Sequence, residues 1–471
     1  MYTNYSDLKT ALLTNSTTCK QVVSDYIEKI EAKKHLNAFL EVFEKSALAK
    51  AKEVDEKIAN GTAGKLAGFV IGLKDNLCYK GHKVSASSKI LEGFESLYSA
   101  TAIEKLVEQD AIIIGRLNCD EFAMGSSNEN SSKGNVLNPV QEDKVPGGSS
   151  GGSAAAVKAG LCLATLGTDT GGSIRQPASF CGVVGLKPTY GRVSRFGLLA
   201  YASSFDQIGP LSNNVEDSAL LLEVMAGKDE NDSTCSQKPT ENYSETVVLN
   251  KKLKIGIPKE VLHNEGLDSE IKENINQLIE KLKAEGHTVE EFSFPYLDYM
   301  VPTYYVLTTA EASSNFSRYD GVHFGYRSPN ATDLESTYTL SRTEGFGEEV
   351  KRRIMLGTFV LSSGYQDAYY TKAMKVRRVL LNKTNEVFDE FDFVLGPTTP
   401  CTAFKIGENV KDPITMYLQD IFTVHANLTG NPAISLPMGE HSNGLPFGVQ
   451  VMGKSFGEKD LLAFSKGLMK L

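Results

Sequence analysis

The sequence predicts an α/β protein in which helices cover both faces of a β-sheet. Apolar runs of strand length alternate with amphipathic helical patterns, most clearly where LKIGI and TVEEFSF flank a helix expected over about 269–285. Such alternation favours parallel pairing of the two strands. The helix itself is indicated by apolar residues at helical spacing, namely Ile271, Ile275, Leu278, Ile279 and Leu282.

Further elements follow from the same patterns along the chain. We expect helices over about 18–38, 47–58, 101–109, 215–226 and 366–390, and a closing helix from about 458. Short strands are expected from Leu66 to Lys74 and over AIIIG at 111–115. The turn-rich, polar run at about 227–250 is predicted to form an excursion on the surface.

Composition narrows the classes of function. Of the 471 residues 41% are hydrophobic and 23% are charged, which is ordinary for globular proteins. The net charge of −9 argues against binding of a nucleic-acid phosphate backbone by this chain alone. We therefore expect a partner protein to bind any nucleic acid. Seven scattered cysteines without a C-x-x-C pair indicate reduced thiols and no metal site. Without a signal peptide pattern or an apolar run of about 18 residues, we expect a soluble, cytoplasmic protein with no membrane contact.

Two Gly-Gly-Ser clusters dominate the stretch from Lys144 to Pro210. They are GGSSGGS at 147–153 and GGS at 171–173, and the apolar run between them has to pack in a core. Glycines let consecutive N–H groups converge on one point, where they can stabilise an anion next to the hydroxyl of Ser173. A flexible linker is the commonest meaning of such a composition. The helix start AAAV after the first cluster favours a site instead.

Lys74 ends a strand that is predicted to be buried. A lysine in this position either extends to solvent, the usual case, or is held in a site. Its place beside two serine clusters favours the site. None of the seven histidines has a context that suggests a catalytic base. A serine nucleophile would then need a neutral lysine as its base, which requires desolvation because a free lysine has a pKa of about 10.4.

Two short motif matches are rejected. Residues 448–455 satisfy G-x-x-x-x-G-K-[ST], but the central VQVM is predicted to extend as a strand, whereas a phosphate-binding loop curls. Residues 148–152 satisfy G-x-S-x-G of α/β-hydrolases, yet no histidine with suitable flanking residues follows. We therefore expect neither ATP binding nor a serine–histidine triad in this chain.

The serine clusters also carry a family resemblance. GGSSGGS, DTGGSIRQP and Lys74 in GLKDN resemble the amidase signature family, and GRVSRFGLLAYASSFDQIGP, DEFAMGSSNEN and VKRRIMLGTF are similar to the glutaminase subunits of tRNA-dependent amidotransferases. The resemblance spans nearly the whole chain. It implies an amidase signature fold with a large mixed β-sheet, a single domain over 1–471, and helices of residues about 1–62 packed on the core.

The resemblance also implies roles for individual residues. Lys74 is the base, Ser149 a bridging serine that follows a cis peptide bond, and Ser173 the nucleophile that attacks an amide. The N–H groups expected to form the oxyanion hole belong, besides Ser173 itself, to Thr170, Gly171 and Gly172.

A substrate pocket for glutamine is implied as well. Arg353 matches the residue that binds the carboxylate, Asp420 the one that binds the ammonium, and Tyr304 a further contact. Taken singly, Arg353 is equally consistent with a solvated helix charge and Asp420 with a surface acid. His425 stands where family members usually have proline, so it is the one visible departure near this pocket.

The function implied is a glutaminase that supplies ammonia for converting Glu-tRNA(Gln), and in many organisms Asp-tRNA(Asn), to the correct amide. The expected partners are B and C subunits in a heterotrimer, with the mischarged tRNA bound through the B subunit. No cofactor is expected in this chain, and ATP and Mg belong to a partner. Two alternatives remain open: a stand-alone amidase for small or peptide amides, and a catalytically silent scaffold.

Overall fold

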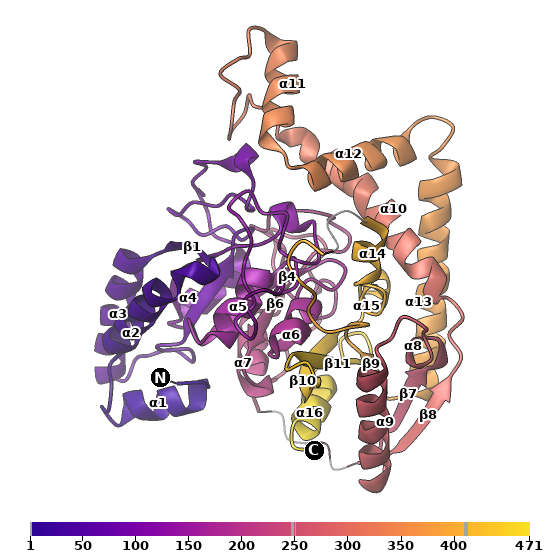
Figure 1. The fold of residues 1–471 in the computed structure, drawn as a ribbon. Coiled ribbons are helices and arrows are strands. Elements are labelled where there is room, and N and C mark those ends of the chain that lie inside the picture. Colours follow the sequence, from indigo (N-terminus) through magenta and orange to yellow (C-terminus); the bar gives the residue numbers. More distant parts are fainter. Residues whose placement is uncertain (1, 246–248, 250, 409–412) are drawn as a thin grey trace.

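A single mixed sheet organises the fold. The computed structural model describes residues 2–245, 249, 251–408 and 413–471 (Figure 1). Within these residues, eleven strands join edge to edge. In spatial order they are β1 (Phe39–Val42), β3 (Ile112–Leu117), β2 (Val70–Lys74), β4 (Ala164–Asp169), β6 (Gln207–Ser212), β5 (Val184–Lys187), β10 (Ala433–Glu440), β11 (Pro446–Met452), β9 (Phe393–Pro397), β7 (Lys254–Pro258) and β8 (Thr288–Phe292).

Parallel pairing is confined to two parts of the sheet. Strand β2 lies parallel to both β3 and β4, and β7 lies parallel to both β8 and β9. The remaining neighbours pair antiparallel. The parallel pairing predicted for LKIGI and TVEEFSF is confirmed, because Lys254 aligns with Thr288. The phosphate-loop match at 448–455 falls mostly within β11, between β10 and β9, as the rejection of that motif required.

The helices pack around this sheet. They are α1 (Tyr5–Leu13), α2 (Cys19–Ala32), α3 (Glu44–Ala59), α4 (Thr101–Glu108), α5 (Gly151–Lys158), α6 (Arg175–Cys181), α7 (Val215–Met225), α8 (Lys259–Leu262), α9 (Ser269–Ala284), α10 (Leu297–Asn315), α11 (Leu334–Gly345), α12 (Glu348–Leu361), α13 (Lys372–Glu390), α14 (Pro413–Leu418), α15 (Val424–Thr429) and α16 (Glu458–Leu468). The helices expected from periodicity are present as α2, α3, α4, α7, α9, α13 and α16, although the helix expected over 18–38 ends at Ala32, where a 3-10 turn at Lys34–Leu36 leads into β1. The expected helix over 366–390 differs at its start, where a π-helical turn at Asp367–Thr371 precedes α13.

Helices α10 and α12 were not predicted, and they pack closely on each other. Gly357 of α12 makes the approach possible, since a Cβ there would lie 1.9 Å from the carbonyl oxygen of Thr309 in α10. The hydroxyls of Ser313 and Thr358 join the same two helices at 3.0 Å. These helices carry Tyr304 and Arg353, so their contact fixes the two side chains relative to each other.

The polar run at about 227–250 is anchored at several points. Asp229 accepts a hydrogen bond from Ser194, Asp232 accepts one from the N–H of Arg195, and Cys235 is buried. Residues 246–248 and 250 lie outside the described residues. The single-domain organisation remains a prediction.

Parallel pairing brings the two serine clusters to Lys74. Strand β2 ends at Lys74 beside β4, with Leu73 aligned with Leu166, so the carboxyl ends of both strands meet at one edge. Strand β4 ends at Asp169 and leads directly into the loop with Ser173. Helix α5 begins just after Ser149 and packs on β4.

Candidate active site

Lys74 is completely buried and faces the first serine cluster. Its Nζ donates hydrogen bonds to Ser149 Oγ at 2.7 Å and to Ser150 Oγ at 2.9 Å. Burial lowers the pKa of Lys74 to about 8, although nearby acidic groups, Asp120 and Asp169 among them, partly oppose the shift. The side chain therefore does not extend to solvent. A substantial neutral fraction exists just above neutral pH, and this fraction can accept a proton.

The chain around Ser149 allows no side chain on the two residues before it. The peptide bond between Gly148 and Ser149 is cis, as the resemblance implied. A Cβ on Gly147 would lie 2.5 Å from Gln176 Oε1, and one on Gly148 would lie 2.1 Å from Asp120 Oδ2. The glycines are thus required by close approach to neighbouring groups, which excludes the flexible-linker interpretation.

Ser173 is held in position by its backbone while its hydroxyl stays unengaged. The N–H of Ser150 donates to the carbonyl of Ser173 at 3.2 Å, which ties the two serine clusters together. Among the described residues, Ser173 Oγ makes no hydrogen bond, and 8% of the residue is exposed, compared with none of Ser149. Ser173 is therefore the serine of this group that an incoming substrate can reach.

A buried ion pair shapes the loop that precedes Ser173. Asp169 accepts hydrogen bonds from the N–H groups of Gly172 and Ile174, at 2.9 and 3.1 Å, and pairs with Arg175 at 3.0 Å through two nitrogens. Burial raises the pKa of Asp169, but the guanidinium of Arg175 outweighs burial and lowers it to about 2. The carboxylate is consequently charged at every working pH.

One N–H group expected in the oxyanion hole has a partner within the protein in this structure. The N–H of Gly172 is occupied by Asp169, so it anchors the loop in this structure. In the part of the chain that the structure describes, the N–H groups of Thr170, Gly171 and Ser173 have no acceptor. These three donors remain for an oxyanion.

The groups expected to bind glutamine lie beside the same loop. Tyr304 approaches Gly171 so closely that a Cβ on the glycine would lie 2.7 Å from the Tyr304 hydroxyl. Arg353 donates to Tyr201 Oη at 3.0 Å and to Glu349 Oε1 at 2.7 Å. Asp420 accepts a hydrogen bond from Ser126 at 2.6 Å.

Their burial decides between the interpretations left open by the sequence. Arg353 is 4% exposed and Asp420 is 7% exposed, so neither is a solvated surface charge. Burial raises the pKa of Asp420 to about 7, a shift that Ser126 and the Arg353 guanidinium oppose. Arg353 and Asp420 are thus both buried, and the guanidinium is near enough to lower the pKa of Asp420, while Arg353 also pairs with Glu349 at 2.7 Å.

Sequence reasoning missed several residues that order this site. They are Ser126, Ser150, Asp169, Arg175, Glu349 and Thr423. The segment DEFAMGSSNEN contributed only to the family resemblance, and no single residue in it indicated a hydrogen bond to Asp420. No sequence pattern indicated a role for Thr423 either, although its hydroxyl donates a hydrogen bond to the carbonyl of Gly171 at 2.7 Å.

His425 is turned toward a different part of the molecule. Its Nε2 lies 2.7 Å from Thr384 Oγ1, and its ring stacks on Phe294 with 4.8 Å between centroids. Burial, with the nearby Arg175, lowers the pKa of His425 to about 4, so the ring is neutral. Its role is packing between α13, α15 and the segment before α10.

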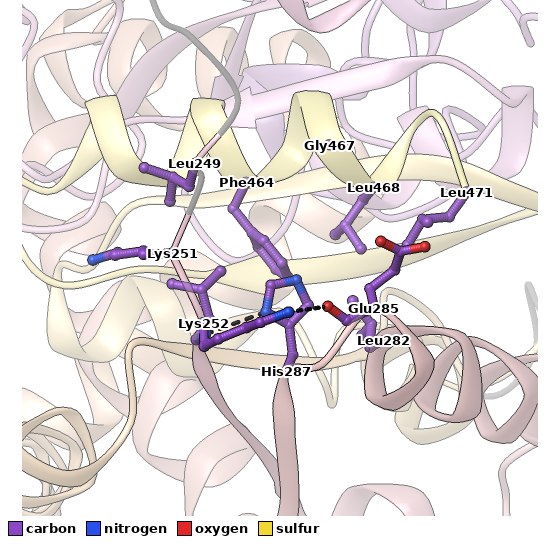
Figure 2. A pocket seen from close by; sticks show the side chains of 11 residues that line it. Leu249, Lys251, Lys252, Leu282, Glu285, His287, Phe464, Gly467, Leu468 and Leu471 are labelled. Atoms are coloured by element: carbon purple, nitrogen blue, oxygen red, sulfur yellow. Dashed lines mark hydrogen bonds between the residues drawn. The ribbon is translucent and has the colours of Figure 1, made fainter.

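A surface pocket elsewhere contains none of the expected site residues. Its cavity of about 430 Å³ lies between α9, α16 and the chain near Leu253 (Figure 2). Lys252 Nζ donates to the carbonyl of Glu285 at 2.6 Å, and His287 Nδ1 accepts from the N–H of Leu253 at 3.2 Å. Because no expected catalytic or substrate-binding group lines it, the pocket adds nothing to the site.

Neither a metal cluster nor a membrane-spanning helix occurs in the described ranges. They contain no group of three or more His, Cys, Asp or Glu side chains that could hold a metal ion. No helix in these ranges is long and apolar enough to cross a membrane.

The fold and the buried Ser-Lys cluster define a class. The profile described as Amidase matches residues 21–462, and the chain belongs to this family. It is 51% identical over 472 residues to the A subunit of the glutamyl-tRNA(Gln) amidotransferase of Chlorobium phaeobacteroides, covering 100% of this chain and 99% of the relative.

Solved structures agree with this assignment. The A subunit of the glutamyl-tRNA(Gln) amidotransferase of Thermotoga maritima is 42% identical with a TM-score of 0.79, covering 96% of this chain and 91% of the other. A peptide amidase from Stenotrophomonas maltophilia is 27% identical with a TM-score of 0.82, covering 99% and 96%. The large mixed sheet with packed helices that the resemblance implied is confirmed by these structures.

Proposed function

We propose that this chain is the glutamine-hydrolysing subunit of a tRNA-dependent amidotransferase. It releases ammonia from glutamine for the conversion of Glu-tRNA(Gln) to Gln-tRNA(Gln), and the same ammonia also suits Asp-tRNA(Asn). The observation that carries the proposal is the burial of both Arg353 and Asp420, together with the position of Tyr304 against Gly171 of the serine loop. An amidase without a free amino acid as substrate has no need of both charges. The named relatives over the full chain length support the same assignment.

The reaction proceeds through an ester on Ser173. Ser173 Oγ attacks the side-chain amide carbon of glutamine while its proton passes to Ser149, and Ser149 passes its own proton to Lys74. The N–H groups of Thr170, Gly171 and Ser173 stabilise the oxygen that becomes negative. The C–N bond then breaks, and the proton held by Lys74 returns through Ser149 to the leaving nitrogen, which departs as ammonia. Water hydrolyses the γ-glutamyl ester and frees glutamate.

Recognition of glutamine uses both ends of the amino acid. The guanidinium of Arg353 binds the α-carboxylate and the carboxylate of Asp420 binds the ammonium. The Tyr304 hydroxyl, held against Gly171, contacts the substrate close to the reacting amide. Because the two charges are nearly inaccessible to water, their contacts are weakly screened and discriminate against amides that lack these groups.

The proposed assembly divides the work among subunits in the cytoplasm. B and C subunits complete a heterotrimer, the B subunit binds the mischarged tRNA, and ATP with Mg belongs to that partner. The net charge of −9 on this chain fits a subunit that leaves the phosphate backbone to another protein.

The test is ammonia release from glutamine by the purified chain, alone and with B and C subunits, Glu-tRNA(Gln) and ATP. Release that depends on Ser173, judged against Ser173→Ala, and that increases with the partners is the expected result. No release from glutamine under any condition would overturn the proposal.

A stand-alone amidase is the second candidate, and the fold shared with a peptide amidase favours it. Its signature would be turnover of small or peptide amides by the chain alone, with no preference for glutamine. A silent scaffold is disfavoured because Lys74 and Ser149 are in hydrogen-bond contact in a buried site.

A further inference from the structure

Helix α12, the turns that follow it and the start of α13 expose a cluster of large apolar side chains. We call it the α12–α13 patch, and it consists of Met355, Leu356, Phe359, Tyr365, Tyr369 and Met374. Met355 is 74% exposed. The rings gather together, with the Phe359 centroid 4.5 Å from that of Tyr365 and 5.7 Å from that of Tyr369.

The patch lies on the outer face of a helix whose inner face serves the active site. Val350, Arg353, Gly357 and Val360 face inward and are buried. Met355, Leu356 and Phe359 are exposed on the same helix, which runs at the edge of the molecule opposite α1 (Figure 1). A contact on the outer face therefore bears directly on the helix that carries Arg353.

Exposure of this kind indicates an interaction surface. Soluble proteins seldom leave aromatic and methionine side chains clustered in water, and Tyr, Phe and Met are enriched at the cores of protein interfaces. The close contact of Gly357 with Thr309 fixes α12 on α10, so the outer face is already ordered before anything binds. Preordering of this kind lowers the entropic cost of association.

The start of α13 exposes positive charges, although the chain as a whole has a net charge of −9. Residues 351–383 include eight Lys or Arg, of which Lys351, Arg352, Arg353 and Lys383 pair with Glu348, Glu349 and Glu386. Lys372, Lys375 and Arg378 are exposed, and none of them forms an ion pair within the described residues. A partner that covers the patch must therefore present acidic groups around an apolar centre.

We propose that the α12–α13 patch docks a second protein subunit whose surface is apolar at the centre and acidic at the rim. This inference rests on the proposed function, under which the occupant is the subunit that receives the ammonia. Nucleic acid is the less suitable occupant. Phe359, Tyr365 and Tyr369 could stack on bases, but their rings pack on one another, and Met355, Leu356 and Met374 offer no flat ring. The net charge of −9 also disfavours nucleic acid, whereas all six side chains suit a protein interface.

The experiment measures binding of B and C subunits from the same source to the purified chain by calorimetry. The disrupting variant is Met355→Glu combined with Phe359→Glu, which places charge at the centre of the patch. Leu13→Glu is the matched control, because Leu13 is 65% exposed and ends α1, a helix on the opposite side of the molecule (Figure 1). Circular dichroism and hydrolysis of a small amide by the chain alone check that each variant is folded.

A loss of affinity of at least about tenfold for the double variant, with the control unchanged, is expected from the removal of central interface residues. A second variant, Lys372→Glu with Lys375→Glu, reverses the charge at the rim of the patch. It should bind the partner subunit more slowly, and the association rate should depend less on salt concentration. If the wild type binds and both patch variants bind equally well, the surface is assigned wrongly while the proposed function stands. If the wild-type chain binds neither of the two subunits, the proposed function fails, and the named partner with it.

Two further outcomes would overturn the inference in favour of another occupant. Sedimentation that shows a dimer of this chain dissociated by Met355→Glu would assign the patch to self-association. Binding of tRNA by the chain alone, lost on reversal of the rim but retained in the double variant, would assign it to nucleic acid.

Discussion

At the scale of single residues, catalysis depends on Lys74 being neutral when the reaction begins. Burial lowers its pKa to about 8, so the amine accepts a proton above that pH and cannot accept one well below it. We expect kcat/KM for a small neutral amide to increase with pH and to level off above about 8. Steady-state kinetics from pH 6 to 10 measure this. A flat profile across the range would contradict the assignment of Lys74 as the base.

Replacement of Lys74 by arginine tests whether this side chain acts as a base. Lys74→Arg keeps a long cationic side chain that stays protonated at all assay pH values, so it cannot act as the base. We expect kcat to decrease about 10²- to 10⁴-fold, the usual contribution of a general base. Retention of wild-type kcat would show that the proton goes elsewhere.

Asp420 is predicted to control affinity for glutamine rather than the chemical step. Its pKa is raised by burial to about 7, so the carboxylate that binds an ammonium is present above pH 7 and is lost as the pH falls. The KM for glutamine should therefore increase below pH 7. Asp420→Asn should increase KM about 10- to 100-fold, because a hydrogen bond to a charged group contributes about 1.5–3 kcal/mol. An unchanged KM with a reduced kcat would place Asp420 in the chemistry instead.

The Asp169–Arg175 pair is predicted to stabilise the serine loop. Arg175→Ala would leave a buried carboxylate without its cation, a change that costs about 3–5 kcal/mol. Urea denaturation measures the free energy of unfolding. Lys34→Ala provides the control, since its pair with Glu31 is exposed and such pairs contribute at most about 1 kcal/mol. Equal stabilities for the two variants would refute a structural role for the buried pair.

At the scale of elements, the contact between α10 and α12 sets the pocket. In Gly357→Ala, the new Cβ meets the backbone of Thr309 at 1.9 Å, and a backbone atom cannot move aside as a side chain can. Alanine favours a helix over glycine by about 1 kcal/mol, but overpacking costs about 1–3 kcal/mol. We expect a net loss of up to about 2 kcal/mol in the free energy of unfolding, together with a higher KM for glutamine as Arg353 moves away from Tyr304.

Gly396→Ala is the control for this change. A Cβ at Gly396 meets its nearest neighbour at an ordinary 3.5 Å, so stability and KM should both stay close to wild type. Thermal melting and glutamine kinetics distinguish the two variants. Gain of stability in Gly357→Ala would mean that helix propensity outweighs the contact.

Helices with a clean apolar stripe could be predicted from sequence, and those without one could not. The spacing of Ile271, Ile275 and Leu282 defined α9 to within one residue at its C-terminal end. Helix α10 contains Pro302 and is buried on several sides, from Thr303 to Ala312, so neither a stripe nor a clear start marks it. In α10, packing against neighbouring helices determines the structure, and the local sequence pattern does not reveal it.

At the scale of the whole molecule, the order of the strands lay beyond any local pattern. Strand β5 is separated from β4 in space by β6, which follows it in the chain, and β10 links the two halves of the sheet. This order decides which loops meet, so the hydrogen bond between Ser126 and Asp420, almost 300 residues apart, could not be inferred from spacing. The serine motifs could be predicted because their glycines and serines are close together in sequence. Lys74, 75 residues before Ser149, was joined to them by the family resemblance.

The most direct test of the central claim is mass spectrometry of the chain after rapid quenching with glutamine. We expect a covalent glutamyl adduct on the peptide that contains Ser173, absent from Ser173→Ala and slow to form in Lys74→Arg. An adduct on any other residue, or one that persists in Ser173→Ala, would contradict the assignment of Ser173 as the nucleophile.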